Sequence, residues 1–325
     1  MKRRLLLSVL GTPALIIPAL ATPALAQSPW PNRPIRIIVP FAAGGSPDVI
    51  ARRLAAHFTQ SFGQPAVVEN RTGAGGIIAS EAVAKAAPDG HTLGISNALP
   101  HVTSPLLNPA TPYDPLHDFT HLAILAGFPL ALGVSAAGPI QTLEEFLAAS
   151  RAKPGGASIG TPGQASLPHI GMELLRQTRG LNYVHVPFRG GAPAAVLETI
   201  AGRLDATFAG FGEMAANDRI RVIAMAAEQR LPSRPELPTF RDSGLDLVAT
   251  VWFGLCAPAG LPPAIAARLS EAAIATAAEP SFTASLTPLG LLPGMRMGMP
   301  QAGAYVASEL ARWGEVVRQA NITAG

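Results

Sequence analysis

The feature that most constrains this chain is a stretch in which a strand is followed by a glycine-rich loop. Residues 35–38 (Ile-Arg-Ile-Ile) are apolar and β-branched except for Arg36, which fits a buried strand, and residues 39–48 (Val-Pro-Phe-Ala-Ala-Gly-Gly-Ser-Pro-Asp) follow directly. Gly44 and Gly45 allow the backbone to turn tightly and to approach a ligand closely. This pattern predicts a βα unit, and any βα turn of an α/β protein can have this form.

The end of the stretch has the residues of a helix start. Ser46 is expected to be the N-cap, with Pro47 at the first helical position and Asp48 in the first turn. Free amide groups and the positive end of the helix dipole would favour an anionic ligand at such a loop. Asp48 would repel an anion. It therefore either stabilises its own helix start or accepts a hydrogen bond from a hydroxyl, an ammonium or a water on the ligand.

The same pattern of strand, Pro-Phe, double glycine and Pro recurs at residues 186–193. Helix starts at Ser46, Ser166 and Ala192 each follow the carboxyl end of an expected parallel strand. Ligands of open α/β sheets bind at that edge. We therefore expect these helix starts to converge on one cleft that binds an anion without an arginine clamp.

The N-terminus has the features of a secretory signal peptide, which we expect to comprise residues 1–26. It carries basic residues at positions 2–4, an apolar segment, and an Ala-Leu-Ala run that ends at Ala26, the expected cleavage site. A membrane anchor is the alternative, and Pro13 and Pro18 within the apolar segment disfavour it. The expectation is a soluble protein, exported by either the general or the twin-arginine route.

Charge and cysteine content exclude several classes of protein. Removal of the signal peptide takes away three basic and no acidic residues, so the net charge falls from +3 to zero. No basic cluster remains to bind nucleic acid. The single cysteine, Cys256, excludes a disulfide scaffold and is expected to be a buried free thiol.

The alternation of strand and helix patterns predicts two α/β domains in series, followed by a tail that returns to the first. Strands are expected at 35–38, 67–70, 92–96, 121–125, 131–134, 158–160, 183–187, 206–208 and 222–226 and from 247 onwards. Helices are expected from about 50 to 62, at 77–87, between a capping box at Thr142 and Glu145 and residue 153, and at 167–179, 196–200, 262–278 and 301–319. Residues 99–118 are expected to be irregular. Lobe 1 is expected at 27–124 and 247–325, lobe 2 at 125–246, and a hinge near 122–126 and 245–250.

Motifs for catalysis, cofactors and metals are absent from the sequence. No Gly-Lys-Ser/Thr follows a glycine loop, and no Gly-x-Ser-x-Gly elbow occurs. His117 and His121 are spaced for a metal on a helix, but a proline-rich context favours loop histidines. His169 could donate to an anion or pack. The expected cleft loops offer only Asp48 as an acid, and Glu213 is expected on the surface. We expect no cofactor and no metal.

Motifs in order along the whole chain resemble the Bug family, the extracytoplasmic solute receptors of tripartite tricarboxylate transporters. They are Trp30-Pro31-x-Arg33-Pro34-Ile35, residues 39–48, 67–71 with 73–76, 87–90, 113–115, 185–188, and 252–254 with 257–260. The resemblance implies a type II periplasmic-binding-protein (Venus-flytrap) fold, in which two α/β domains are joined by two crossing strands. It also implies a monomer that binds a small carboxylate and presents it to membrane permease subunits.

By the same resemblance, the first βα loop and the loop at 160–166 hold the ligand carboxylate. The residues carried over are Phe41, Ala43, Gly44, Gly45, Ser46 and Asp48 on one lobe and Gly160, Thr161, Gln164, Ala165 and Ser166 on the other. Ser96, Asn97, His169, Phe188, Arg189, Gly210, Phe211 and Trp252 join them.

Two departures from the family pattern bear on the ligand. The segment 209–212 (Ala-Gly-Phe-Gly) stands where the family often has an acidic or amide pair, and Phe188-Arg189 stands in place of a common Tyr-Lys. These changes predict a more apolar wall, which favours an aromatic or hydrophobic acid. A receptor that signals to a membrane sensor is an alternative to transport, and an enzyme acting on a carboxylic acid is a third possibility.

Overall fold

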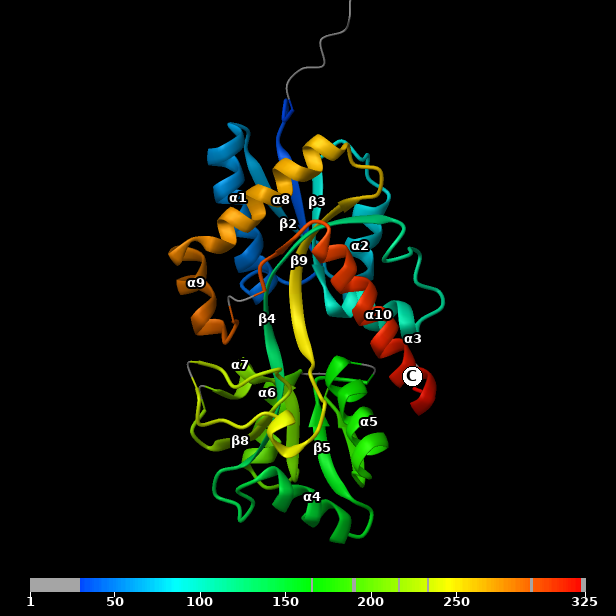
Figure 1. The fold of residues 1–325 in the computed structure, drawn as a ribbon, viewed down its shortest axis with the longest axis vertical. Coiled ribbons are helices and arrows are strands. Elements are labelled where there is room, and N and C mark those ends of the chain that lie inside the picture. Colours follow the sequence, from blue (N-terminus) through cyan, green and yellow to red (C-terminus); the bar gives the residue numbers. More distant parts are fainter. Residues whose placement is uncertain are drawn as a thin grey trace, which may run out of the picture.

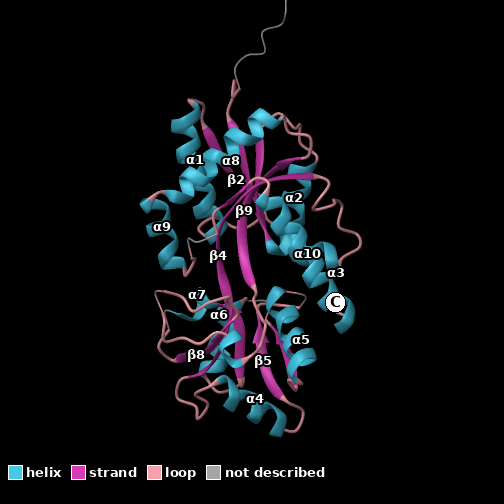
Figure 2. Cartoon of the chain, viewed as in Figure 1, coloured by secondary structure: helices cyan, strands magenta, loops and turns pink. Residues whose placement is uncertain are grey.

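The computed structural model describes residues 30–322 except 165, 189, 190, 216, 233, 293 and 294, so the expected signal peptide lies outside the described residues. The described residues form an elongated α/β molecule with strands along its long axis and helices on both faces (Figures 1 and 2). Ten strands of the described residues share one sheet, in the order 66–70, 35–39, 92–97, 250–258, 119–135, 206–210, 157–161 and 183–187; the strands 220–225 and 297–298 also pair with 119–135. None of the described helices is long and apolar enough to cross a membrane.

One end of the molecule is the first α/β unit. Its parallel strands are β1 (Ile35–Val39), β2 (Ala66–Asn70) and β3 (Thr92–Asn97), with helices α1 (Ser46–Phe62) and α2 (Ile77–Ala84). Gly63 ends α1 in the left-handed conformation, as the sequence predicts. The segment expected to be irregular contains two short helical pieces, η2 (Leu99–Thr103) and α3 (Ser104–Leu107).

The other end is the second α/β unit. Its parallel strands are β5 (Ala157–Thr161), β6 (Tyr183–Pro187) and β7 (Ala206–Gly210). The strand β8 (Ile220–Met225) pairs instead with residues 131–135, in the antiparallel direction. Its helices are α4 (Leu143–Ala152), α5 (Leu167–Arg179), α6 (Ala192–Ile200) and α7 (Phe211–Ala215). The predicted capping box is confirmed, because Thr142 and Glu145 each bond the other's backbone at the start of α4.

The tail returns to the first unit, as expected. Strand β9 (Thr250–Pro258) lies between β3 and β4 and is antiparallel to both. It is followed by α8 (Pro263–Ala278), α9 (Pro280–Leu286), the 3-10 turn η4 (Thr287–Leu289), β10 (Met297–Gly298) and α10 (Gln301–Ala320). Figure 1 shows α10, in red, extending to the second unit, where its end lies beside α5.

Strand β4 (Phe119–Ser135) joins the two units. Two separate strands were expected here, whereas the structure has one strand of 17 residues. Residues 119–129 pair with β9, and residues 130–135 pair with β7 and β8. We therefore call residues 30–129 and 250–322 lobe 1 and residues 130–249 lobe 2. Rotation about the predicted hinge segments stays a prediction.

A buried polar cluster lies beneath the end of β3. Cys256 is a buried free thiol, as expected, and its Sγ donates to the carbonyl of Gly94 at 3.4 Å. The His101 ring lies 3.9 Å (Nε2) from this sulfur, and its Nδ1 accepts from the amide of Asn97 at 3.4 Å. The ring of His121 lies 5.7 Å from that of His101, centroid to centroid. Burial, and then the neighbouring His121, lower the pKa of His101 to about 3.

Candidate functional site

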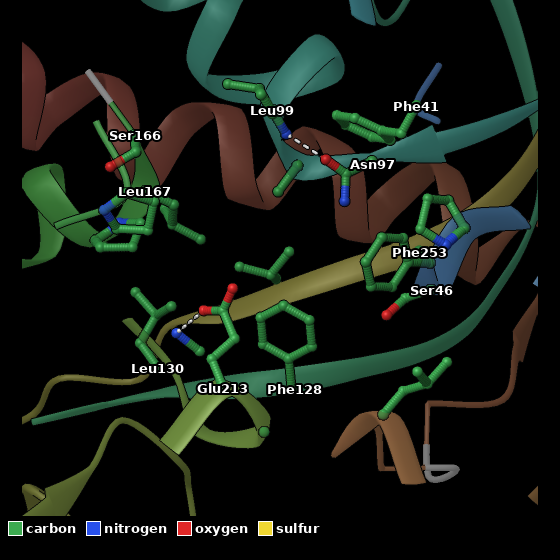
Figure 3. Close-up of a pocket in the computed structure, with 18 residues that line it drawn as sticks. Phe41, Ser46, Asn97, Leu99, Phe128, Leu130, Ser166, Leu167, Glu213 and Phe253 are labelled. Carbon is green, nitrogen blue, oxygen red and sulfur yellow. Dashed lines mark hydrogen bonds between the residues drawn. The ribbon is translucent and has the colours of Figure 1, made fainter. Parts of the chain in front are cut away.

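A cavity of about 360 Å³ lies between the two lobes. Its walls come from the β1–α1 loop, the end of β3, the crossing part of β4, the β5–α5 loop, α7, β9 and η4. The described residues that line it are Phe41, Ser46, Pro47, Asn97, Ala98, Leu99, Phe128, Leu130, Pro162, Ser166, Leu167, Pro168, Gly210, Gly212, Glu213, Val251, Phe253 and Leu289 (Figure 3). We call this cavity the interlobe pocket.

The N-termini of two helices from opposite lobes meet at the interlobe pocket. Ser46 and Pro47 open α1, and Ser166 stands immediately before α5. Ser166 is the N-cap that the sequence predicts, because its hydroxyl accepts the amide of His169 at 3.4 Å. The cap of α1 was predicted wrongly, since Gly45 occupies the N-cap position and Ser46 is already the first helical residue. The Ser46 side chain is thus part of the pocket wall, and the dipoles of both helices favour an anion there.

Asp48 is turned away from the pocket and is 2% exposed. Its Oδ2 accepts from the Gly44 amide at 2.9 Å and from Arg52 Nε at 2.8 Å, and its Oδ1 accepts from Asn70 Nδ2 at 3.0 Å. Burial by itself raises the pKa of this carboxyl, but the hydrogen bonds from Arg52, Gly44 and Asn70 outweigh it and leave the pKa lowered. Asp48 therefore shapes the glycine loop and also occupies the Gly44 amide, which the sequence suggested would be free for a ligand.

Asn97 lines the pocket, and its side-chain amide forms hydrogen bonds with two nearby backbone groups. Its Nδ2 donates to the carbonyl of Trp252 at 2.9 Å, which ties β3 to β9. Its Oδ1 accepts from the amide of Leu99 at 2.9 Å, which starts the turn after β3 (Figure 3). Asn97 is one of the residues predicted for the site, and its side chain holds the pocket wall together.

Most of the wall is apolar. Three phenylalanines contribute, and Phe128 and Phe253 lie 6.0 Å apart, centroid to centroid, from adjacent strands. The remaining apolar side chains come from both lobes and from η4: Leu99, Leu130, Leu167, Val251 and Leu289. Among the described lining residues none is Lys, Arg or His, so hydrophobic contact and helix termini are the main means of binding.

Glu213 is exposed, as expected, but the sequence did not indicate that its side chain lines the interlobe pocket. Its carboxylate rises from α7 between Leu130 and Phe128 into the interlobe pocket (Figure 3). Its Oε2 accepts the amide of Gly210 at 3.0 Å. Solvent reaches the side chain through the cleft, yet the surrounding protein removes enough water to raise the pKa of the carboxyl. A signal was available, because Glu213 lies three residues beyond the end of β7, at the edge where ligands bind.

The structure brings some of the predicted site residues together and separates others. Phe41, Ser46, Asn97, Ser166 and Gly210 line the interlobe pocket. The described residues that do not line it are Ala43, Gly44, Gly45, Asp48, Ser96, Gly160, Thr161, Gln164, His169, Phe188, Phe211 and Trp252. Ala165 and Arg189 lie outside the described residues. The helix start at Ala192 also does not line the pocket, so two of the three expected helix termini meet there.

Side-chain direction explains the separated residues of lobe 2. Thr161 points to the far side of β5, where its Oγ1 lies 2.7 Å from His185 Nε2. The His169 ring stacks on that of His185 at 3.9 Å, so this histidine packs in lobe 2 and lines a different cavity with Gln164. Phe211 is buried, with the Arg234 guanidinium 6.0 Å from its ring.

Side-chain direction also explains why the predicted residues Trp252 and Ser96 of lobe 1 do not line the interlobe pocket. Trp252 is fully buried and packs edge-on against Tyr305 at 5.9 Å, on the face of β9 opposite to the pocket. Ser96 is fully buried on β3, opposite Gly254 of β9. Ser96 and Trp252 therefore lie on strands that reach the interlobe pocket, but their side chains do not line it.

No group of three or more His, Cys, Asp or Glu side chains in the described part of the chain is placed to hold a metal ion. His121 is buried and its Nε2 lies 2.8 Å from the carbonyl of Pro115, while the exposed His117 pairs with Asp114. The two histidines therefore do not share one helix face.

Two α/β lobes joined by paired crossing strands, with a ligand-sized pocket between them, define a periplasmic-binding-protein fold. The family model described as "Tripartite tricarboxylate transporter family receptor" (TctC) matches residues 50–322. The chain belongs to this family of solute-binding receptors.

Relatives and solved structures agree with this assignment. BugT of Bordetella pertussis is 33% identical over 324 residues, which cover 97% of each chain. A TctC solute-binding protein from Polaromonas, solved without ligand, superposes with a TM-score of 0.80 at 28% identity over 89% of this chain and 99% of that one. A protein of R. palustris solved with adipate has a TM-score of 0.77 at 30% identity over 90% and 99% of the chains. MatC from Rhodopseudomonas palustris with bound malate has a TM-score of 0.72 at 31% identity over 89% and 100%.

Proposed function

We propose that this protein captures a small organic carboxylate in the interlobe pocket and delivers it to the permease of a tripartite tricarboxylate transporter. The observation that carries the proposal is the convergence of the α1 and α5 N-termini, one from each lobe, on a single apolar pocket. A carboxylate placed between them would contact both lobes at once. Binding would therefore favour the closed arrangement of the lobes.

The interaction free energies expected in this pocket are large enough for a micromolar complex. Each helix terminus contributes about 0.3–1 kcal/mol towards an anion, and up to about 2 kcal/mol when partly buried. Charge-assisted hydrogen bonds from the loop amides add about 1.5–3 kcal/mol each. A micromolar complex needs about 8 kcal/mol, so burial of an apolar ligand body must supply part of the total.

The wall composition favours a ligand with a hydrophobic or aromatic body. The structural neighbours include proteins solved with adipate and with malate, both carboxylates. Here Phe41, Phe128 and Phe253 surround the space where the body of the ligand would lie. An aromatic or branched acid buries more apolar surface against these rings than a short hydroxylated diacid does.

The test uses the mature chain, residues 27–325, in a thermal-shift screen followed by calorimetry. Adipate, malate, benzoate, phenylacetate and 3-phenylpropanoate form the first panel. We expect at least one aromatic or branched carboxylate to raise the melting temperature and to bind more tightly than malate. A panel in which no carboxylate raises the melting temperature counts against the proposal, and tighter binding of malate counts against an apolar ligand.

Delivery is tested in cells. We expect deletion of the gene to abolish uptake of the identified carboxylate, and the plasmid-borne gene to restore it only when residues 1–26 are present and are removed from the mature protein. Mass spectrometry of the secreted chain would show whether cleavage follows Ala26. Normal uptake in the deletion strain would contradict a transport role and favour a receptor that signals.

A further inference from the structure

Glu213 is the only ionisable side chain among the described residues that line the interlobe pocket. It lies on α7 of lobe 2, and its carboxylate faces the apolar side chains of both lobes (Figure 3). The other polar side chains among the described lining residues, Ser46, Asn97 and Ser166, are neutral, so Glu213 supplies the charge that a ligand in this pocket would meet.

The local backbone is shaped to hold this carboxylate in the pocket. Gly210 donates its amide to Oε2 at 3.0 Å. A Cβ at position 210 would lie 2.5 Å from the Phe128 ring and 3.0 Å from Glu213 Oε2. The absence of a side chain at Gly210 thus leaves room for both the ring and the carboxylate, side by side.

No cation balances Glu213 within the described part of the chain. Only the Gly210 amide bonds the carboxylate, and no charged side chain influences its pKa. By contrast, the acidic residue Asp48 accepts from Arg52, and Asp205 of lobe 2 pairs with Lys153 at 2.6 Å. Glu213 is exposed in the described structure, so water can solvate its Oε1. A ligand that fills the pocket displaces this water and must supply a donor or a cation in its place, because a carboxylate enclosed by apolar groups without a partner is costly.

We propose that Glu213 is a specificity-determining residue that accepts an ammonium group of the ligand. This inference rests on the proposed function, because the ligand carboxylate is assigned to the α1 and α5 N-termini. The ligand class is then an amino acid with an apolar or aromatic body: its carboxylate lies at the helix termini, its ammonium at Glu213 and its side chain among the phenylalanines. An ammonium satisfies the site better than a hydroxyl, because it supplies both the missing donor and the missing charge.

Three matched compounds test the inference on the wild-type protein by calorimetry. L-phenylalanine carries both charged groups, 3-phenylpropanoate lacks the ammonium, and phenethylamine lacks the carboxylate. We expect L-phenylalanine to bind at least about tenfold more tightly than either of the others. L-leucine and 4-methylpentanoate repeat the comparison with a smaller body.

The variant Glu213→Gln keeps the shape and the acceptor for Gly210 while removing the charge. We expect it to weaken L-phenylalanine binding at least about tenfold and to leave 3-phenylpropanoate binding unchanged or tighter, since the repulsion between two carboxylates is gone. The control is Glu236→Gln, an exposed residue paired with Arg234, which should change neither affinity. If Glu213→Gln does not fold, the order of the affinities of the three compounds for the wild-type protein decides the test.

Two outcomes distinguish the possible failures. Equal or tighter binding of 3-phenylpropanoate than of L-phenylalanine, with the ranking unaltered in Glu213→Gln, overturns the role of Glu213 and leaves the carboxylate receptor in place. A panel in which neither the amino acids nor the plain carboxylates bind overturns the proposed function, and the Glu213 inference with it.

Discussion

Gly212 of lobe 2 and Gly290 of lobe 1 touch through their backbones at the rim of the interlobe pocket. A Cβ built on Gly290 would lie 2.0 Å from the Cα of Gly212, and one built on Gly212 would lie 2.7 Å from the Cα of Gly290 and from the carbonyl oxygen of Leu289. Neither residue can gain a side chain without separating the segments that carry them. The two glycines therefore set how closely α7 and η4 approach.

We expect Gly212→Ala to weaken ligand binding by about tenfold or more, because its methyl group meets backbone atoms of the other lobe. Calorimetry with the identified ligand gives the affinity, and small-angle scattering of the ligand-bound protein reports the lobe separation. The control is Gly303→Ala in α10, where a Cβ meets nothing within 4 Å. An unchanged affinity and an unchanged scattering profile in Gly212→Ala would show that this contact does not limit closure.

Asp48→Asn should destabilise the protein by about 1–3 kcal/mol at pH 7. The carboxylate accepts from Gly44, Arg52 and Asn70, and an amide in its place leaves at least one donor facing its NH₂ group. Urea denaturation measures the loss, with the exposed Asp246→Asn as control, where about 0.5 kcal/mol or less is expected.

The effect of Asp48 should also depend on pH. Its folded-state pKa is lowered, so its stabilising contribution is present above the unfolded value of 3.8 and disappears as the pH falls through the folded pKa. The stability difference between wild type and Asp48→Asn should therefore be largest near neutral pH and shrink below the unfolded value. A difference that grows on acidification would contradict this assignment.

Phe128→Ala should enlarge the interlobe pocket and weaken binding of an aromatic ligand by about tenfold, since the ring packs beside Phe253 in the apolar wall of the pocket. A short carboxylate that does not reach the ring should lose less. Calorimetry with two ligands of different body size makes the comparison, and Leu197→Ala on the exposed face of α6 is the control. Equal losses for both ligands would mean that the ring supports the fold and does not contact the ligand.

Acid should destabilise the protein from about pH 6.5 downwards because His101 is buried as a neutral ring. Its pKa is about 3 in the folded state and 6.5 when unfolded, so only the unfolded state takes up a proton between these values. Stability then falls with decreasing pH by about 1.4 kcal/mol per unit for this residue. The lowered pKa values of His121, His169 and His185 act in the same direction.

The variant His101→Asn isolates this contribution, because an asparagine oxygen can still accept the Asn97 amide. Urea denaturation at pH 7, 6 and 5 should give a slope against pH that is smaller by up to about 1.4 kcal/mol per unit than that of the wild type. The control Leu197→Ala, which changes an exposed apolar residue, should keep the wild-type slope. Parallel slopes for wild type and His101→Asn would show that this ring does not control acid stability.

Local signals predicted much of the fold. The strand, glycine loop and helix at the start of lobe 1, the capping box at Thr142 and the cap at Ser166 all depend on neighbouring residues, and the structure confirms them. The return of the tail to lobe 1 followed from the absence of a new glycine loop after residue 247. By contrast, the contact between α10 and α5 depends on residues far apart in the sequence, and no local pattern indicates it.

The candidate site was harder to predict, because it depends on which way each side chain points. In the first turn of α5, Leu167 and Pro168 face the interlobe pocket, whereas the next residue, His169, turns towards His185. Trp252 likewise points away from the pocket while its neighbours Val251 and Phe253 line it, as expected when successive strand residues face opposite sides. Without the pairing partners of β9, the sequence could not decide which face was inward.

The long strand β4 has a mechanical consequence for this receptor. A paired strand that passes from one lobe to the other has a preferred twist, set by the sheet, and resists a change of that twist. A loop at the same place would let the lobes rotate more freely. The pairing with β9 continues to Pro129 and Thr250. Proline has no N–H to donate, so the hydrogen bonding between the two strands is weaker at this position. We expect rotation of the two lobes to twist this strand, so the free energy of rotation, and with it the affinity for a ligand held between the lobes, would depend also on residues that do not touch the ligand.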